Sequence, residues 1–416
     1  MSECGCETVT EPAMKPLEEA LELLLSHART VSGTEVVPLA EANGRVLAES
    51  VVSRINMPPW DNSAMDGYAV NSADISAPGT GLRISQRIPA GAAPQPLEPG
   101  TAARIFTGAP VPEQADSVVI QEVCRQEGEQ VVIDEVPQPG ANIRRAGEDT
   151  RVGQAVLEAG TRLGAQHLGL AASVGVGELT VYRRLKVALF SSGDELINPG
   201  QPLGPGQIYN SNEYTLQALL QSLGCELVSL GIVADTFDAT CDALARAAAQ
   251  ADLVMTSGGV SVGEEDHLKP AVEKLGSLDL WKIAIRPGKP LAFGHIEGTP
   301  FIGTPGNPVS LFVTFCLFAR PFILKSQGVG ESQLVPTPVP ARADFDWPKA
   351  EKRREFARAR LQLDGEGLGR VSLYSSRSSG VLNSLTWANG LAILPEGQTL
   401  ARGDTVRFIP FSELLK

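Results

Sequence analysis

The sequence predicts a multi-domain α/β plus β protein, with a doubly wound parallel α/β domain, an inserted N-terminal β domain and a small C-terminal β-barrel. Its 416 residues exceed what one hydrophobic core normally serves. Strand-like and helical runs alternate in residues 183–327, which is typical of a parallel sheet. Short β-type runs, rich in Pro and Gly, occupy residues 54–143 and 328–416.

The N-terminal region is predicted to be discontinuous. Residues 14–53 begin with a helix, because leucine recurs on one helical face at positions 17, 21, 24 and 25. The runs TAARIFTG, SVVIQEV and QVVIDEV in residues 54–143 are typical of short strands. A helical and glycine-rich pattern returns in residues 144–182. A β domain inserted into a helical and linker domain explains this order.

The α/β domain, residues 183–327, begins with the apolar strand KVALF. The helix NSNEYTLQALLQSLG, the strand CELVSLGIV, the helix DATCDALARAAAQ and the strand DLVMT follow. A last strand, FIGT, precedes a long apolar helix. Ligands of such sheets bind beyond the carboxyl ends of the strands.

The C-terminal region, residues 328–416, opens with the linker-like VPTPVPA. The runs FARARLQL, GRVSLYS, LAILPEG and TVRFIPF are short strands separated by turns. This spacing predicts a small β-barrel.

Composition excludes several classes of protein. The formal net charge is −13, whereas nucleic acids and anionic membranes bind basic surfaces. No apolar run reaches the roughly 18 residues that a membrane helix needs, and the N-terminus lacks a signal-peptide pattern. We expect a cytoplasmic protein that binds neither nucleic acid nor membrane. Cys4 and Cys6 lie close together, but no His or further Cys nearby completes a zinc site, so a disordered tail is the simpler interpretation.

The stretch TSGGVSVGEEDH, residues 256–267, combines two features that conflict unless a cation is present. Gly258 and Gly259 follow a strand and let backbone N–H groups approach an anion. The acidic residues 264–266 would repel a phosphate unless a hard cation such as Mg²⁺ lay between them. The sequence therefore predicts a phosphate compound bound with a metal, with Asp266 as a ligand. An ordinary strand–helix turn is the alternative.

Two further carboxylates follow neighbouring strands. Glu195 lies in FSSGDEL after the first strand, and Asp235 follows the second. Each alone is more typical of a cap or turn, but together they favour a shared site at one sheet edge.

The positive charge that an anion needs is concentrated in LWKIAIRPGKPLAFG. It carries Lys282, Arg286 and Lys289, which form a plausible anion clamp in an acidic protein. A solvated edge strand is an equally compatible alternative. The loop GTPGNPVS adds backbone amides and Ser310, which can cap an oxyanion.

Seven motifs occur in order along the chain: DNSAMDGYAV, TGAPVP, RRAGEDT, FSSGDEL, SGGVSVGEED, RPGKPLAFG and TPGNPVS. This series resembles the molybdopterin molybdenumtransferase family, the MoeA type of bacteria, to which the E domain of gephyrin is similar. The resemblance runs from about Leu17 to the C-terminus.

Enzymes of this family insert molybdate into adenylylated molybdopterin and release AMP in a Mg²⁺-dependent step. The resemblance implies these substrates and this cofactor, and makes the α/β domain the molybdopterin-binding domain. It also implies a four-domain homodimer, in which the N-terminal part of one chain approaches the α/β domain of the other. Other molybdopterin-biosynthesis enzymes and acceptor molybdoenzymes are then its partners.

The resemblance also assigns roles by position. Its acidic motif residues imply a catalytic set: Asp66, Asp149, Glu195, Asp235 and Asp266. The last three are the implied metal ligands. The implied substrate-binding set is Thr107, Gly258, Gly259, Ser261, Lys282, Arg286, Lys289, Pro305, Pro308, Ser310, Arg358 and Ser379.

One position departs from the family pattern. The usual Lys-Pro-Gly is Arg286-Pro287-Gly288 here, which keeps the charge but replaces a point donor with a planar fork. Two other functions are the alternatives. A molybdopterin adenylyltransferase would explain residues 185–325 alone, and a non-catalytic scaffold would not need the carboxylates and basic strip.

Overall fold

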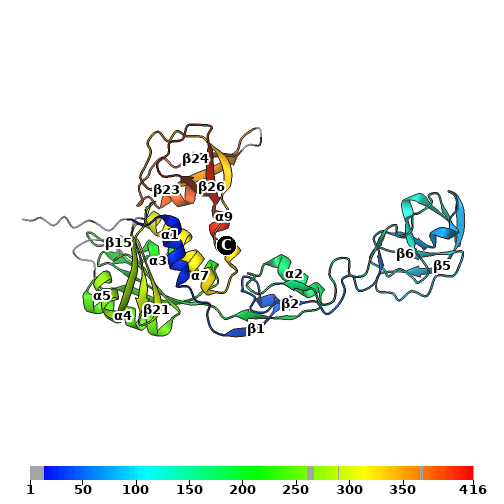
Figure 1. The fold of residues 1–416 in the computed structure, drawn as a ribbon, viewed down its shortest axis with the longest axis horizontal. Coiled ribbons are helices and arrows are strands. Elements are labelled where there is room, and N and C mark those ends of the chain that lie inside the picture. Colours follow the sequence, from blue (N-terminus) through cyan, green and yellow to red (C-terminus); the bar gives the residue numbers. More distant parts are fainter. Residues whose placement is uncertain (1–13, 260–266, 289, 366, 368, 416) are drawn as a thin grey trace, which may run out of the picture.

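The chain folds into several separate units, and the distal β unit lies far from the other two (Figure 1). The computed structural model describes residues 14–259, 267–288, 290–365, 367 and 369–415. Figure 1 shows the α/β unit at one end with the C-terminal β unit stacked on it, and a β unit containing β5 (Thr80–Ile88) and β6 (Thr101–Ile105) at the far end. A slender two-stranded segment with β1 (Thr34–Pro38) joins them.

The α/β unit is a six-stranded sheet in the order β16 (Glu226–Val233), β13 (Lys186–Ser192), β17 (Leu253–Ser257), β21 (Thr299–Thr304), β20 (Pro290–Ile296) and β18 (Gly276–Lys282). The first four strands are parallel, as predicted. However, β20 pairs antiparallel with both of its neighbours, β21 and β18, so the sheet is mixed. This hairpin comes from the basic strip, whose strand periodicity does not specify a partner.

Helices cover both faces of this sheet. Side chains of β13 alternate between two hydrophobic cores, since Val187 packs in one and Ala188 in the other. The first core also receives α3 (Ser211–Ser222) and α6 (Pro308–Thr314), and the second receives α4 (Phe237–Gln250) and α5 (Leu268–Leu275). The doubly wound prediction is therefore confirmed.

The long apolar helix of the sequence is continuous from residue 308 to 326. It consists of α6, the π-helical turn η4 (Phe315–Ala319) and α7 (Arg320–Ser326). Among the described residues it is the one helix long and apolar enough to cross a membrane, but 94 % of its apolar window is buried within the protein. It is a core helix of the α/β unit, where α1 (Leu17–Ser26) packs beside it.

The N-terminal β sheet has the order β7 (Ser117–Ile120), β4 (Gly67–Val70), β6, β5, β9 (Gln130–Ile133) and β8 (Cys124–Glu127). It has hydrophobic cores of its own. Segments before and after it are joined, because β1 pairs with β12 (Glu178–Tyr182) and β2 (Val51–Val52) with β11 (Ala155–Leu157). Helix α2 (Ala165–Ser173) packs on this connection.

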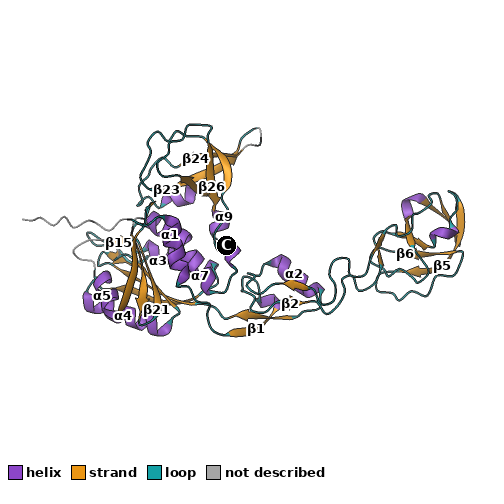
Figure 2. Cartoon of the chain, viewed as in Figure 1, coloured by secondary structure: helices purple, strands orange, loops and turns teal. Residues whose placement is uncertain are grey.

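The C-terminal strands close into a small barrel. The order is β23 (Arg354–Leu363), β24 (Gly369–Leu373), β22 (Val339–Ala343), β26 (Thr405–Pro410) and β25 (Gly390–Leu394), and β25 pairs back with β23. The short strand β19 (Ile285–Arg286) leaves the α/β unit and pairs with β23, which joins the two units. The remaining short strands and α-helices, visible in part in Figure 2, are β3 (Asn62–Ser63), β10 (Ile143–Arg144), β14 (Leu196–Ile197), β15 (Ile208–Tyr209), α8 (Asn383–Trp387) and α9 (Phe411–Leu414).

Candidate functional site

A cleft of about 1190 Å³ lies where the carboxyl ends of the parallel strands face a loop of the barrel. This is the edge at which ligands of open α/β sheets bind. Nine residues proposed from the sequence line it: Glu195, Asp235, Gly258, Gly259, Arg286, Pro305, Pro308, Ser310 and Ser379. Residues distant in sequence therefore converge on one site.

Two carboxylates are among the described residues that line the cleft. Glu195 follows β13 and Asp235 follows β16, so the parallel order of these neighbouring strands brings the two carboxylates to the same edge. Ser192 donates a hydrogen bond from Oγ to Oδ1 of Asp235 at 3.2 Å. The backbone N–H of Asp235 donates to Oδ1 of Asp194 at 3.1 Å. These contacts fix the second strand end against the first.

Glycine loops form the floor of the cleft. Gly258 has φ +87°, and a Cβ atom there would meet the carbonyl oxygen of Ser192 at 2.8 Å, so only glycine fits this close approach. Asn212 on α3 ties the loop to its neighbour, because its Nδ2 donates to Ser257 Oγ at 2.9 Å and to the Gly306 carbonyl at 2.7 Å. These two bonds tie both glycine loops to α3.

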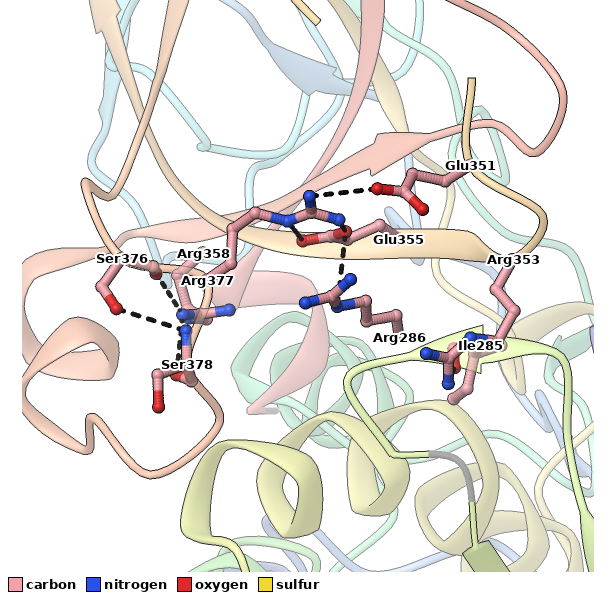
Figure 3. Close-up of polar contacts among 9 residues, drawn as sticks. All are labelled: Ile285, Arg286, Glu351, Arg353, Glu355, Arg358, Ser376, Arg377 and Ser378. Atoms are coloured by element: carbon pink, nitrogen blue, oxygen red, sulfur yellow. Dashed lines mark hydrogen bonds and ion pairs between the residues drawn. The ribbon is translucent and has the colours of Figure 1, made fainter. Parts of the chain in front are cut away.

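Two arginines that line the cleft, Arg286 and Arg377, are gathered around Glu355 (Figure 3). The Glu355 side chain is 2 % exposed, and Arg377 donates to its two oxygens, from Nε at 3.2 Å and from Nη2. Nε of Arg286 lies 3.8 Å from the same carboxylate. Arg377 also donates from Nη1 to Glu351 at 3.1 Å. The hydrogen bond to Glu355 raises the pKa of Arg377, and the bond from Arg377 lowers that of Glu351.

Arg358 lies behind this cluster and does not line the cleft. Its buried guanidinium donates to the carbonyl of Ser376 at 2.6 Å and to that of Ser378 at 3.1 Å (Figure 3). Burial lowers the pKa of Arg358. The loop that it holds presents Ser379, whose carbonyl accepts from the Val309 N–H at 3.0 Å. Arg358 thus positions a loop that borders the cleft.

Several residues of the predicted set lie elsewhere. Lys282, on β18, does not line the cleft. Asp66 and Thr107 flank β4 and β6 in the sheet at the far end of the chain, and Asp149 follows β10 (Figure 1). Within one chain these three do not reach the cleft. The proposed residues Ser261, Asp266 and Lys289 lie outside the described residues.

The distal motif has an ordered geometry of its own. Asp66 Oδ1 accepts from the Thr107 N–H and from its hydroxyl, each at 2.8 Å, and these bonds lower the pKa of Asp66. Asp61 accepts from Arg145 Nη1 at 2.6 Å and from the Ala146 N–H at 2.8 Å. These bonds therefore join motifs that are separated in the sequence.

Sequence reasoning missed several polar side chains of the cleft, among them Asn212, Arg353 and Arg377. Arg377 lies inside SSRSSG, from which only Ser379 was selected. Arg353, beside β23, donates to the Ile285 carbonyl at 3.2 Å. Its proximity to Arg286 depends on the β19–β23 pairing, which no local signal announces.

Comparisons with known proteins cover nearly the whole chain. Residues 15–175 match the model of the MoeA N-terminal region (domain I and II), 188–325 match a probable molybdopterin binding domain, and 340–411 match the MoeA C-terminal region (domain IV).

Two relatives are named molybdopterin molybdenumtransferase. The protein from Haemophilus influenzae is 41 % identical over 97 % of this chain and 100 % of its own length. The protein from a Nostoc species is 39 % identical over 93 % of this chain and 91 % of its own length. A solved structure described as a molybdopterin biosynthesis moeA protein from Pyrococcus horikoshii has a TM-score of 0.81 at 30 % identity, covering 96 % of this chain and 100 % of that one. The chain belongs to the MoeA family of molybdopterin molybdenumtransferases.

Proposed function

We propose that this protein inserts molybdate into adenylylated molybdopterin, forming molybdenum cofactor and releasing AMP. The observation that carries the proposal is the cleft itself, whose described lining includes two carboxylates and three arginines. Glycine loops line the same cleft. A phosphoanhydride bound with a cation requires carboxylates and backbone amides, and a small oxyanion requires cationic side chains.

Mg²⁺ fits the two carboxylates of the cleft. Glu195 and Asp235 offer hard oxygen donors on adjacent strand ends, and Mg²⁺ is commonly held by one or two carboxylates together with phosphate oxygens. When bound, Mg²⁺ would polarise a phosphate oxygen of the anhydride. We propose Asp266, which follows Gly258 and Gly259 in the sequence, as a third ligand.

The chain's own residues supply binding and orientation. The backbone amides of Gly259 and Gly306 are the proposed donors to the phosphate groups of the adenylylated substrate, whereas the Gly258 N–H already donates to the Thr304 carbonyl at 3.1 Å. Arg286 and Arg377 are held in place by Glu355, so their guanidinium groups are oriented before an oxyanion arrives. Ser379 lies in the loop supported by Arg358 and can donate to the same oxyanion.

The motif that contains Asp66 and Thr107 needs a second chain to contribute to the cleft. Within one chain it lies at the far end of the molecule from the cleft (Figure 1). We propose a homodimer in which Asp66, Thr107 and Asp149 of one chain complete the cleft of the other. We further propose that it acts in the cytoplasm, between other molybdopterin-biosynthesis enzymes and the molybdoenzymes that accept the cofactor.

The test is AMP release from adenylylated molybdopterin by purified protein with Mg²⁺, with and without molybdate. We expect release that depends on molybdate and is accompanied by cofactor formation. Formation of the adenylylated compound from molybdopterin and ATP, without release of AMP from that compound, would instead identify an adenylyltransferase. Binding without either reaction would identify a scaffold.

A further inference from the structure

Two of the chain's four histidines converge on a carboxylate at the edge of the α/β sheet. His27, Asp279 and His295 each offer a ligand atom, and these atoms lie within 4.8 Å of one another. Nδ1 of His295 is 3.3 Å from Oδ2 of Asp279. None of the three lines the cleft proposed for molybdate. The cluster is therefore separate from the site already described.

The fold brings these residues together from three elements. His27 is the first residue after α1, and His295 lies on β20. On β18, the pairing shifts between Leu278, opposite Gly294, and Leu280, opposite Phe293, so Asp279 is the extra residue of a β-bulge. Bulges re-aim side chains and are frequent beside functional sites. This bulge occurs at the residue that contacts His295.

We propose that His27, Asp279 and His295 bind a divalent cation of the zinc class. Imidazole nitrogen with one carboxylate is a donor set that suits Zn²⁺, Co²⁺ or Ni²⁺, whereas Mg²⁺ prefers oxygen alone. Bonds of about 2.0–2.2 Å at tetrahedral angles place neighbouring ligand atoms roughly 3.4 Å apart. His295 and Asp279 already have that separation. His27 has to approach by at most about 1.4 Å to complete the set.

An ion pair between Asp279 and His295 does not account for His27. The His27 ring lies 5.2 Å from the His295 ring, centroid to centroid, and both rings pack near Phe293. His27 and His295 also line a cavity of about 620 Å³, so an ion between them would have room for water as a fourth ligand. Three protein ligands with one open position make a recognised zinc arrangement.

Three of the four described cysteines are poor competitors for this ion. Burial raises the pKa of Cys124 to about 11 and that of Cys225 and Cys316 to about 12, and only a thiolate binds metal well. The ion would tie the end of α1 to the sheet edge. Because a ligand that binds only the folded state stabilises it, metal should raise the unfolding temperature.

The experiment is a titration of the full chain, stripped with chelator, with Zn²⁺, followed by Co²⁺ absorption spectra. We expect one high-affinity ion per chain, with tetrahedral cobalt bands and no thiolate charge transfer. His27→Gln, Asp279→Asn and His295→Gln should each weaken Zn²⁺ affinity at least tenfold and abolish the rise in unfolding temperature. Circular dichroism confirms that each variant is folded.

Two matched controls decide the outcome. His167→Gln removes a histidine that accepts a hydrogen bond from the Gly164 N–H at 2.9 Å in another unit, and it should bind Zn²⁺ like the unaltered chain. Cys4→Ser with Cys6→Ser tests the N-terminal thiols and should also leave binding intact. The proposal is overturned if no ion binds, if the cluster variants bind normally, or if only the cysteine variant loses binding. AMP release plays no part in these readouts, so failure here is distinct from failure of the proposed reaction.

Discussion

Arg286 and Glu355 face each other across the β19–β23 pairing, with Nε of Arg286 3.8 Å from the Glu355 carboxylate. The pairing places Arg286 opposite Glu355 in register, so the contact forms only when the barrel is seated on the α/β unit. Arg377 completes the cluster from the barrel side. The buried Glu355 carboxylate therefore links docking of the barrel to the placement of two arginine side chains in the cleft.

Replacing Glu355 with Gln should destabilise the fold by about 1–3 kcal/mol, because two arginines lose their buried acceptor. The same change should raise the KM for molybdate, since the arginines are no longer held. Urea unfolding and steady-state kinetics measure the two effects. Glu351→Gln is the matched control: Glu351 bonds the same Arg377 from a more exposed position, so its replacement should change the free energy of unfolding far less. Equal effects of the two changes would contradict the special position of Glu355.

Arg286→Ala should raise the KM for molybdate tenfold or more, which corresponds to about 1.4 kcal/mol of lost binding. Arg286→Lys keeps the charge and restores the family's usual residue, so it should retain most of the affinity. Arg342→Ala is a control, because that exposed arginine bonds the Gly403 carbonyl within the barrel and does not line the cleft. An unchanged KM in Arg286→Ala would remove Arg286 from the oxyanion site.

Gly258→Ala should abolish turnover, because the added methyl group would lie 2.8 Å from the Ser192 carbonyl oxygen. Positive φ alone costs alanine roughly 1–2 kcal/mol. Gly206→Ala isolates that cost, since Gly206 also has positive φ, at +78°, but nothing lies within 4 Å of its added Cβ. Gly258→Ala should be the less stable of the two by thermal unfolding. Comparable stability and retained activity would show that the close approach is not needed.

The pKa of Asp66 should be below its ordinary value and should rise in Thr107→Val, which removes the hydroxyl donor. Carbon NMR of the Asp66 carboxyl group during an acid titration measures it. A depressed pKa stabilises the fold at pH values above the unfolded pKa, and that contribution is lost as the pH falls through the folded pKa. Asp134, whose pKa is lowered by Arg125, should titrate identically in both proteins.

The carboxyl-edge site was predictable because parallel strands bring their ends together. Glu195, Asp235 and Gly258 each follow a strand whose apolar pattern is clear in the sequence. The position of Arg286 in the cleft instead depends on β19 leaving its sheet to pair with the barrel. Such long-range pairing leaves no local periodicity, so Arg353 and Arg377 were missed.

The distal residues show the complementary limit. Asp66 and Thr107 carry no local sign of function, and their assignment depends on resemblance alone. The structure joins them by two hydrogen bonds but places them far from the cleft of their own chain. The basic strip LWKIAIRPGKPLAFG has a clear strand pattern, but that pattern does not predict that β20 pairs antiparallel with its neighbours.

The most direct measurement is AMP release by mixed dimers of Asp66→Asn and Glu195→Gln chains. Each parent should be folded and inactive. Random reassortment makes half of the dimers mixed, and each mixed dimer has one intact cleft if Asp66 acts across the interface. We predict molybdate-dependent AMP release at about one quarter of the unaltered rate. No activity above that of the parents, or full activity of the Asp66→Asn parent, would contradict a catalytic cleft completed by the second chain.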